Sequence, residues 1–175
     1  ERVWSMINTI VEVDVPHSTI ADIMPSYANS IFCFCPPGDD PSRRGLIDML
    51  VSGCIPVVFS PLTLHNGQYP WFIGEVTARR VSILIPEGIY TAKQAPLEKG
   101  VIAFLQSIDK QVIKQKLHDI SILAPQLQYS IPPIAQLKHH LDHDCNNESD
   151  RFDPPFTDAM DVAVDGMIDR AERGI

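Results

Sequence analysis

The apolar residues of this chain fall into short runs that alternate with stretches of helical periodicity. The segments "SIFCFCPP" and "CIPVVFS" are compact apolar runs bounded by Pro or Gly, and each predicts a buried strand. Between them, "SRRGLIDMLVSG" predicts a helix that ends at Gly53. Its apolar residues at helical spacing are Leu46, Ile47, Leu50 and Val51. Strand, helix and strand in about thirty residues form a βαβ unit, so we expect a parallel sheet.

Further helices and one more strand are predicted on both sides of this unit. "HSTIADIMPSYANS" predicts a helix capped by Ser18 or Thr19, and Pro25 either limits this helix or lies in its first turns. The opening segment "RVWSMINTIVEVDV" fits either a helix or a strand. "VSILIPE" predicts a third strand, and residues 97–108 and 109–126 predict helices. The apolar stripe of the second of these helices comprises Val112, Ile113, Leu117 and Ile120.

The last segment, residues 156–175, predicts an amphipathic helix with Thr157 as its N-cap. One face carries Met160, Val164, Met167 and Ile168. The acids Asp158, Asp161, Asp165 and Asp169 belong mostly to the other face, which we interpret as solvated. We therefore expect an α/β domain with a parallel sheet over residues 1–155, with an irregular connection at 126–155, followed by this helix.

The net charge and the length of the apolar runs exclude some classes of protein. A net charge of −8 and a pI near 5.1 argue against a nucleic-acid binder, which is usually basic. No apolar run approaches the length of about 18 residues that spans a bilayer. The chain opens on Glu1 without an initiator Met, so we expect it to be a piece of a longer protein.

Four cysteines occur, and three of them lie in the predicted βαβ unit. Cys33 and Cys35 are two residues apart in one strand, so they share a face and are poorly placed to bridge each other. We expect Cys33, Cys35 and Cys54 to be buried thiols of the core, outside any disulfide. The sequon at 147–149 would accept a glycan in a secretory compartment.

The loop after the first predicted strand has residues that suit the binding of a phosphate group. Ligands of open α/β sheets bind at the carboxyl ends of the strands, and a helix N-terminus there favours phosphate. Ser42 adds a hydroxyl, and Arg43 and Arg44 add guanidinium groups that suit phosphate oxygens. The alternative is that both arginines are solvated, or that one pairs with Asp39 or Asp40. Neither a P-loop nor a Gly-x-Gly-x-x-Gly fingerprint occurs.

The run "SIFCFCPPGDDPSRRGLIDMLVSGCIPVVF" resembles the signature of exostosin-type glycosyltransferases, glycosyltransferase family 47. Within that family it is most similar to the plant xyloglucan galactosyltransferase-like branch. "QYPWF", "ILIPE" and "DAMDVAVDGMIDR" resemble later segments of that branch in the same order. The resemblance covers roughly residues 27–125 and 156–173.

The resemblance implies a GT-B architecture of two Rossmann-like halves, of which this chain is the C-terminal, donor-binding half. This half would have a parallel sheet with helices on both faces, and the helix at 156–175 would brace the absent N-terminal half. It implies that Gly38 and Asp39 belong to the donor loop and that Ser42, Arg43 and Arg44 face the donor diphosphate. Asp48 would hold the ribose hydroxyls, and Glu87 is a second candidate for ribose or sugar contact. The residues implied to line or close the sugar pocket are Gln68, Tyr69 and Trp71. Ordinary surface or packing roles remain alternatives for Asp48, Tyr69, Trp71 and Glu87.

By resemblance, the reaction would be inverting transfer of a sugar from a nucleoside diphosphate, expected to be UDP, to a glycan acceptor. The general base and the acceptor groove would lie in the absent N-terminal half, so this chain alone is expected to bind donor without efficient transfer. Ile47 replaces an aromatic residue of the branch, and the sequence "FIGEVTARR" differs from the one usual in the branch. The identity of the transferred sugar is therefore left undetermined. The longer protein would be a single-pass type II membrane protein with this domain in the Golgi lumen.

Two other functions remain open. In the first, the chain keeps the sheet and serves as a non-catalytic carbohydrate- or nucleotide-binding module of a larger assembly. Alternatively, "KHHLDHDC" at 138–145 offers histidines, aspartates and a cysteine for a metal ion. An Asp-x-Asp metal motif should end a buried strand, whereas this one lies in a polar stretch, so we expect donor binding that needs no metal cofactor.

Overall fold

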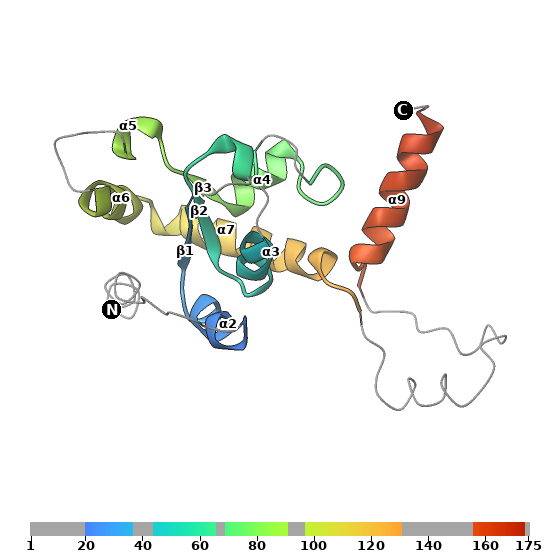
Figure 1. Ribbon diagram of the computed structural model, residues 1–175, viewed down its shortest axis with the longest axis horizontal. Helices are drawn as coiled ribbons and strands as arrows, with labels where there is room; N and C mark the ends of the chain where they lie inside the picture. The colour runs from blue at the N-terminus through green and yellow to red at the C-terminus, as the bar shows by residue number, and fades with distance from the viewer. Residues whose placement is uncertain (1–19, 37–43, 66–68, 91–96, 131–155, 174–175) are drawn as a thin grey trace. The chain divides into compact units, whose positions relative to one another are not determined.

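The computed structural model describes residues 20–36, 44–65, 69–90, 97–130 and 156–173 (Figure 1). The chain divides into two compact units, Glu1–Ala124 and Pro125–Ile175, and each is described by itself. The predicted opening segment, the 138–145 cluster and the sequon lie outside the described residues, as does most of the expected irregular connection. The predicted domain boundary after residue 155 stays a prediction. Within the described ranges, no helix is long and apolar enough to cross a membrane.

The first unit contains a three-stranded parallel sheet in the order β1-β2-β3, which confirms the α/β class and the βαβ unit. The strands are β1 (Phe32–Cys35), β2 (Ile55–Val58) and β3 (Ile83–Leu84). All four residues of β2 are buried, as expected for the central strand of a parallel sheet. Figure 1 shows β2 between its two neighbours.

Helices connect and cover these strands. Those around the first two strands are α2 (Ile20–Ala28), which continues through Pro25, and α3 (Arg44–Val51). The segment after β2 forms the 3-10 helix η1 (Pro61–Thr63) and α4 (Glu75–Val81). Beyond β3 lie α5 (Glu87–Tyr90), α6 (Leu97–Gln106), α7 (Lys110–Leu123) and the 3-10 helix η2 (Ala124–Leu127).

The core lies where α3 and α7 pack on β2. Leu46 and Leu50 of α3 are fully buried, whereas Ile47 and Val51 of the predicted apolar set are half-buried. The predicted stripe of α7 was wrong at its first member, because Val112 is 46% exposed. The buried residues of α7 are Asp119, Ile120 and Leu123, so the helix is buried toward its C-terminal half. Burial of Asp119 is compensated because Arg80 of α4 donates to both of its carboxylate oxygens at 3.2 Å.

Gly53 ends α3 as predicted, in a left-handed conformation with φ of 78°. The amide of Cys54 donates to the carbonyl of Met49 at 2.9 Å, and the amide of Gly53 donates to Leu50 at 3.0 Å. This pair of bonds is a Schellman motif, in which glycine avoids the steric penalty that a Cβ would meet. The motif turns the chain directly from α3 into β2 and places Cys54 at the base of that strand.

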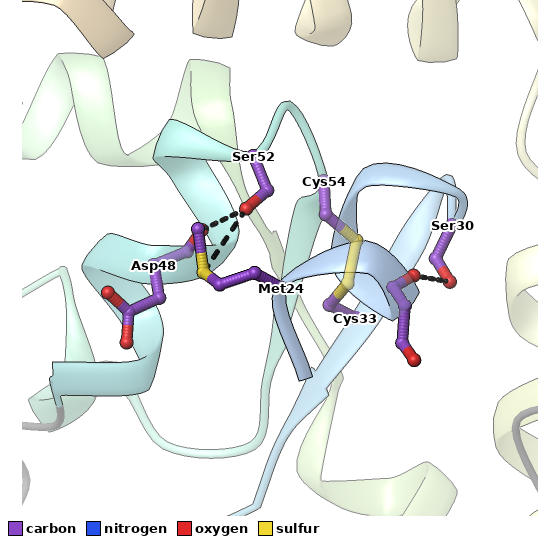
Figure 2. The surroundings of a disulfide bond; sticks show 7 residues. Met24, Ser30, Cys33, Asp48, Ser52 and Cys54 are labelled. Atoms are coloured by element: carbon purple, nitrogen blue, oxygen red, sulfur yellow. Dashed lines mark hydrogen bonds between the residues drawn. A yellow bond between two sulfur atoms is a disulfide. The ribbon is translucent and has the colours of Figure 1, made fainter. Parts of the chain in front are cut away.

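The prediction that Cys33 and Cys54 are unbridged thiols was wrong, because the two form a disulfide with a Cα–Cα distance of 5.9 Å (Figure 2). The parallel register explains the pairing. Cys33 lies opposite Pro56, and Cys54 precedes Pro56 by two residues, so both side chains point to the same face. Cys35 is buried outside the disulfide, as expected.

In the second unit, α9 (Ala159–Glu172) begins one residue later than predicted. Its N-cap is Asp158 rather than Thr157, because the Asp158 carboxylate accepts from the amides of Met160 and Asp161. Asp161 completes a capping box by accepting from the amide of Asp158 at 3.1 Å. Asp158 is therefore buried, contrary to the interpretation of all four acids as a solvated face.

Hydrogen bonds to the Asp158 carboxylate favour its charged form and predict that the second unit loses stability in acid. The hydroxyl and amide of Ser130 donate to this carboxylate and, with the capping amides, lower its pKa from 3.8 to about 2. A carboxylate with a depressed pKa stabilises the fold above its unfolded-state pKa, and this contribution is lost as pH falls from 3.8 toward 2. We predict that Asp158→Asn lowers the melting temperature of α9 at pH 5, and that the difference from wild type shrinks toward pH 2.

Circular dichroism melts over this pH range would check the prediction. Asp165→Asn, which removes an exposed acid of the same helix, is the matched control. A difference between Asp158→Asn and wild type that stays constant from pH 5 to pH 2 would refute the role of the Asp158 charge.

Candidate donor-binding site

The predicted site residues that the structure describes all follow the carboxyl ends of the three parallel strands. Arg44 and Asp48 lie on α3 after β1, Tyr69 and Trp71 lie between β2 and α4, and Glu87 follows β3. The carboxyl ends of adjacent parallel strands meet at one edge of a sheet, and ligands of open α/β sheets bind at that edge. The topology therefore brings the segments that carry these residues to one edge of the sheet.

Arg44 is the first residue of α3, and its side chain is 74% exposed. Its Nε lies 3.7 Å from Oδ2 of Asp48, one turn along the helix, whose side chain is 25% exposed. The alternative partners Asp39 and Asp40 lie outside the described residues. An ion pair of this exposure contributes only a few tenths of a kcal/mol, so Arg44 can turn toward a bound anion at little cost.

Asp48 lies on the side of α3 that faces α2. The hydroxyl of Ser52 donates to the carbonyl of Asp48 at 2.7 Å and lies 3.7 Å from the sulfur of Met24 on α2. At the other end of the same face, a Cβ on Gly45 would lie 3.7 Å from the hydroxyl oxygen of Tyr27. In Figure 2 the Asp48 carboxylate points away from Met24 and from the disulfide. This contribution of α2 was missed at the level of sequence.

The segment after β2 forms a tight turn that displays Trp71. The amides of Phe72 and Ile73 donate to the carbonyl of Tyr69 at 3.1 and 2.7 Å. Ile73 is fully buried, whereas Tyr69 is half-buried and Trp71 is 41% exposed at the tip of the turn. A partly exposed indole is a good surface for stacking on a ring, which suits the role implied for Trp71.

A buried histidine, His65, links the segment after β2 to the residue that follows α4. The hydroxyl of Ser82 donates to the carbonyl of Ala78 at 2.6 Å, so its oxygen accepts from Nε2 of His65 at 3.0 Å. Burial lowers the pKa of His65, and its Nδ1 has no hydrogen-bond partner among the residues described. Because the Ser82 proton is directed at a backbone carbonyl and not at His65, the pair is a structural contact and not an activated nucleophile.

Helix α4 is fixed at its C-terminal end by α7. The ammonium group of Lys116 donates to the carbonyl oxygens of Arg79 at 2.7 Å and Ser82 at 2.8 Å. Burial lowers the pKa of this lysine, while the charge of Asp119 opposes the change. These bonds hold the C-terminal end of α4, the helix that follows the Trp71 turn, against α7.

Glu87 does not end a strand as predicted, because β3 stops at Leu84 and Glu87 is the first residue of α5. Two residues, Ile85 and Pro86, separate it from the strand, and Glu87 is exposed. An acid in the first turn of a helix is favoured by the helix dipole, so its position has a structural reason beside any role in binding.

Gly38, Asp39, Ser42, Arg43 and Gln68 lie outside the described residues, so their roles stay predictions. Within the part of the chain that the structure describes, no group of three or more His, Cys, Asp or Glu side chains is arranged to hold a metal ion.

Comparison with known proteins identifies the family. Residues 8–94 match the exostosin GT47 domain. A probable xyloglucan galactosyltransferase of Arabidopsis thaliana, GT12, is 30% identical over 151 residues, which cover 85% of this chain and 25% of that protein. The xyloglucan galactosyltransferase MUR3 is 27% identical over 172 residues, or 97% of this chain and 24% of that protein.

A related enzyme with a different sugar in its name also matches. The xyloglucan-specific galacturonosyltransferase 1 of the same plant is 28% identical over 150 residues, 85% of this chain and 19% of that protein. This chain thus spans about a quarter of the length of the curated relatives it matches. No solved structure matches the chain at a significant level. The family match and these relatives, all named as glycosyltransferases, show that the chain belongs to the exostosin GT47 family of glycosyltransferases.

Proposed function

We propose that this chain is the donor-binding, C-terminal half of a GT-B glycosyltransferase and that it binds a UDP-sugar. The observation that carries the proposal is the position of α3, which begins after β1 with the exposed Arg44 and holds Asp48 one turn later. A helix start with a cation at the carboxyl edge of a parallel sheet suits a diphosphate.

Each element at the edge has a proposed task. Arg44, with Ser42 and Arg43 of the preceding loop, binds the diphosphate through charge-assisted hydrogen bonds. Asp48 accepts two hydrogen bonds from the vicinal hydroxyls of the ribose. Trp71 and Tyr69, with Gln68, form the wall of the sugar pocket, and Glu87 contacts the ribose or the sugar. Gly38 and Asp39 belong to the loop that leads to the helix.

The proposed reaction is inverting transfer. An acceptor hydroxyl oxygen attacks the anomeric carbon of the donor, and the bond from that carbon to the diphosphate oxygen breaks. The hydroxyl proton passes to a general base in the N-terminal half, and UDP leaves. The amides at the start of α3 and the guanidinium of Arg44 stabilise the negative charge that grows on the leaving diphosphate. This stabilisation replaces the role that a divalent ion would otherwise serve.

The relatives suggest the class of substrate. Their names include galactosyltransferases and a galacturonosyltransferase, all with xyloglucan in the name, so we propose a hexose or hexuronate donor and a xyloglucan-like acceptor. The two donors differ at C6, and the residues that discriminate between them belong to the sugar pocket beside Trp71.

The Cys33–Cys54 disulfide indicates in which cellular compartment the protein is found. Disulfides persist in oxidising compartments such as the secretory lumen and are rare in the cytosol. The Cys33–Cys54 bond of the central sheet therefore supports a luminal location, and we propose the Golgi lumen for the longer, type II membrane protein.

Binding of UDP tests the proposed function. We predict that UDP binds the purified chain with the same affinity in the presence and absence of a chelator, because α3 and Arg44 supply the positive charge. Isothermal calorimetry in EDTA, and again with added Mn²⁺, would check this. Failure to bind UDP in either buffer would favour a non-catalytic module, and binding only with Mn²⁺ would contradict the metal-independent site.

A further inference from the structure

We propose that Tyr27 of α2 is a substrate-binding residue of the nucleotide site, where its hydroxyl donates to the ribose of the donor beside Asp48. The proposal rests on the proposed function of α3, and it adds a residue that lies outside the donor loop and outside the helix that follows it. Its basis is the packing of α2 against the first two turns of α3.

The geometry places the Tyr27 hydroxyl at the first turn of α3. A Cβ on Gly45 would lie 3.7 Å from this oxygen, which is ordinary van der Waals contact. Gly45 is the second residue of α3 and follows Arg44 directly. The hydroxyl therefore reaches the part of the helix where the phosphate and the ribose of a nucleotide are expected to lie.

Asp48 lies on the same face of α3 as Gly45, because residues three apart are neighbours on a helix surface. Met24 and Tyr27 are likewise three apart on α2, and Met24 contacts Ser52, which directly follows α3. The two helices thus face each other with Tyr27 toward the start of α3 and Met24 toward its end. Asp48 lies between these two contacts, with its carboxylate directed away from Met24 (Figure 2).

The chemistry of the phenol suits this position. Its pKa is raised by burial, then by the negative charge of Asp48 and by Cys35, so the hydroxyl keeps its proton at physiological pH. Among the residues that the structure describes, the hydroxyl has no hydrogen-bond partner. A phenol hydroxyl at this position can donate to a ribose oxygen while Asp48 accepts from the ribose hydroxyls, which gives one donor and one acceptor for a diol.

The experiment compares UDP with 2′-deoxy-UDP, since only the first offers the full diol. Calorimetric titrations would use the whole chain as wild type, Tyr27→Phe, Asp48→Asn and Gly45→Ala. Tyr129→Phe, which removes the hydroxyl of an exposed tyrosine in the second unit, is the matched control. Gly45→Ala keeps the helix and covers the Tyr27 hydroxyl with a methyl group, so it tests the same contact without changing Tyr27.

We expect wild type and Tyr129→Phe to prefer UDP over 2′-deoxy-UDP. Tyr27→Phe and Gly45→Ala should reduce that preference about three- to tenfold, as for the loss of one hydrogen bond, with unchanged melting temperatures. Asp48→Asn should also reduce it. If Asp48→Asn reduces the preference and Tyr27→Phe does not, the role of Tyr27 is wrong and the proposed function stands.

Other outcomes are equally decisive. Equal weakening of both nucleotides by Tyr27→Phe, together with a lower melting temperature, would show that Tyr27 only packs α2 on α3. A preference that survives Asp48→Asn would refute the assignment of Asp48 to the ribose. Absence of UDP binding to wild type would overturn both the proposed function and the role of Tyr27.

Discussion

Replacing Cys33 and Cys54 together by alanine is expected to lower the free energy of unfolding of the first unit by about 3 kcal/mol. The bond joins residues 21 positions apart in the sequence. Without it, the unfolded chain gains the conformational freedom that the closed loop denies it. The closed loop contains the end of β1, the donor loop and all of α3, so the same bond limits how far the candidate site can move from the sheet.

Guanidinium unfolding followed by circular dichroism would measure this effect. Wild type with a reducing agent should behave like the double variant, and the double variant itself should not respond to the reducing agent. Cys35→Ala is the matched control, because it removes a buried thiol of the same strand and leaves the disulfide intact. Equal unfolding midpoints for the double variant and wild type would contradict the role of the bond.

Replacing Arg44 by alanine is expected to weaken UDP binding by about 1.5–3 kcal/mol, the cost of one charge-assisted hydrogen bond to phosphate. Arg44 loses only an exposed pair with Asp48 when it turns to the ligand, so most of the new interaction appears as affinity. The stability of the chain should change little.

Arg79→Ala provides a matched control for the Arg44 variant. Arg79 is also an exposed arginine in an i,i+4 ion pair, with Glu75 at 2.7 Å, but it lies in the last turn of α4. Calorimetry should give the same UDP affinity for Arg79→Ala and wild type. If Arg44→Ala also binds UDP like wild type, the start of α3 is not the phosphate site.

Most of the fold around the site follows from patterns that are local in the sequence. Two apolar runs bounded by Pro and Gly gave β1 and β2, and Gly53 marked the end of α3, because strand length, turn residues and left-handed glycine are local properties. The N-cap of α9 was misplaced by one residue, since Thr157 and Asp158 are both good caps. The choice depended on Ser130, which is distant in the sequence.

The site was harder to predict because it depends on contacts between elements. The disulfide requires the register that sets Cys33 opposite Pro56, and no spacing rule supplies that register. Tyr27 belongs to a helix with no motif of its own, and its place beside Gly45 follows only from the packing of α2 on α3. Arg44 and Asp48 could be proposed from sequence because both belong to one short helix after a strand, and their roles in binding stay predictions.

The most direct test of the central claim is to locate UDP on the chain by nuclear magnetic resonance. Titration of UDP into the isotopically labelled protein, in the presence of a chelator, reports on every assigned backbone amide and on the Trp71 indole. We predict that the largest shift changes occur at the amides of residues 44–48, at Tyr27 and at the Trp71 indole. Changes confined to α9, or no changes at millimolar UDP, would contradict the assignment of this chain as the donor-binding half of a glycosyltransferase.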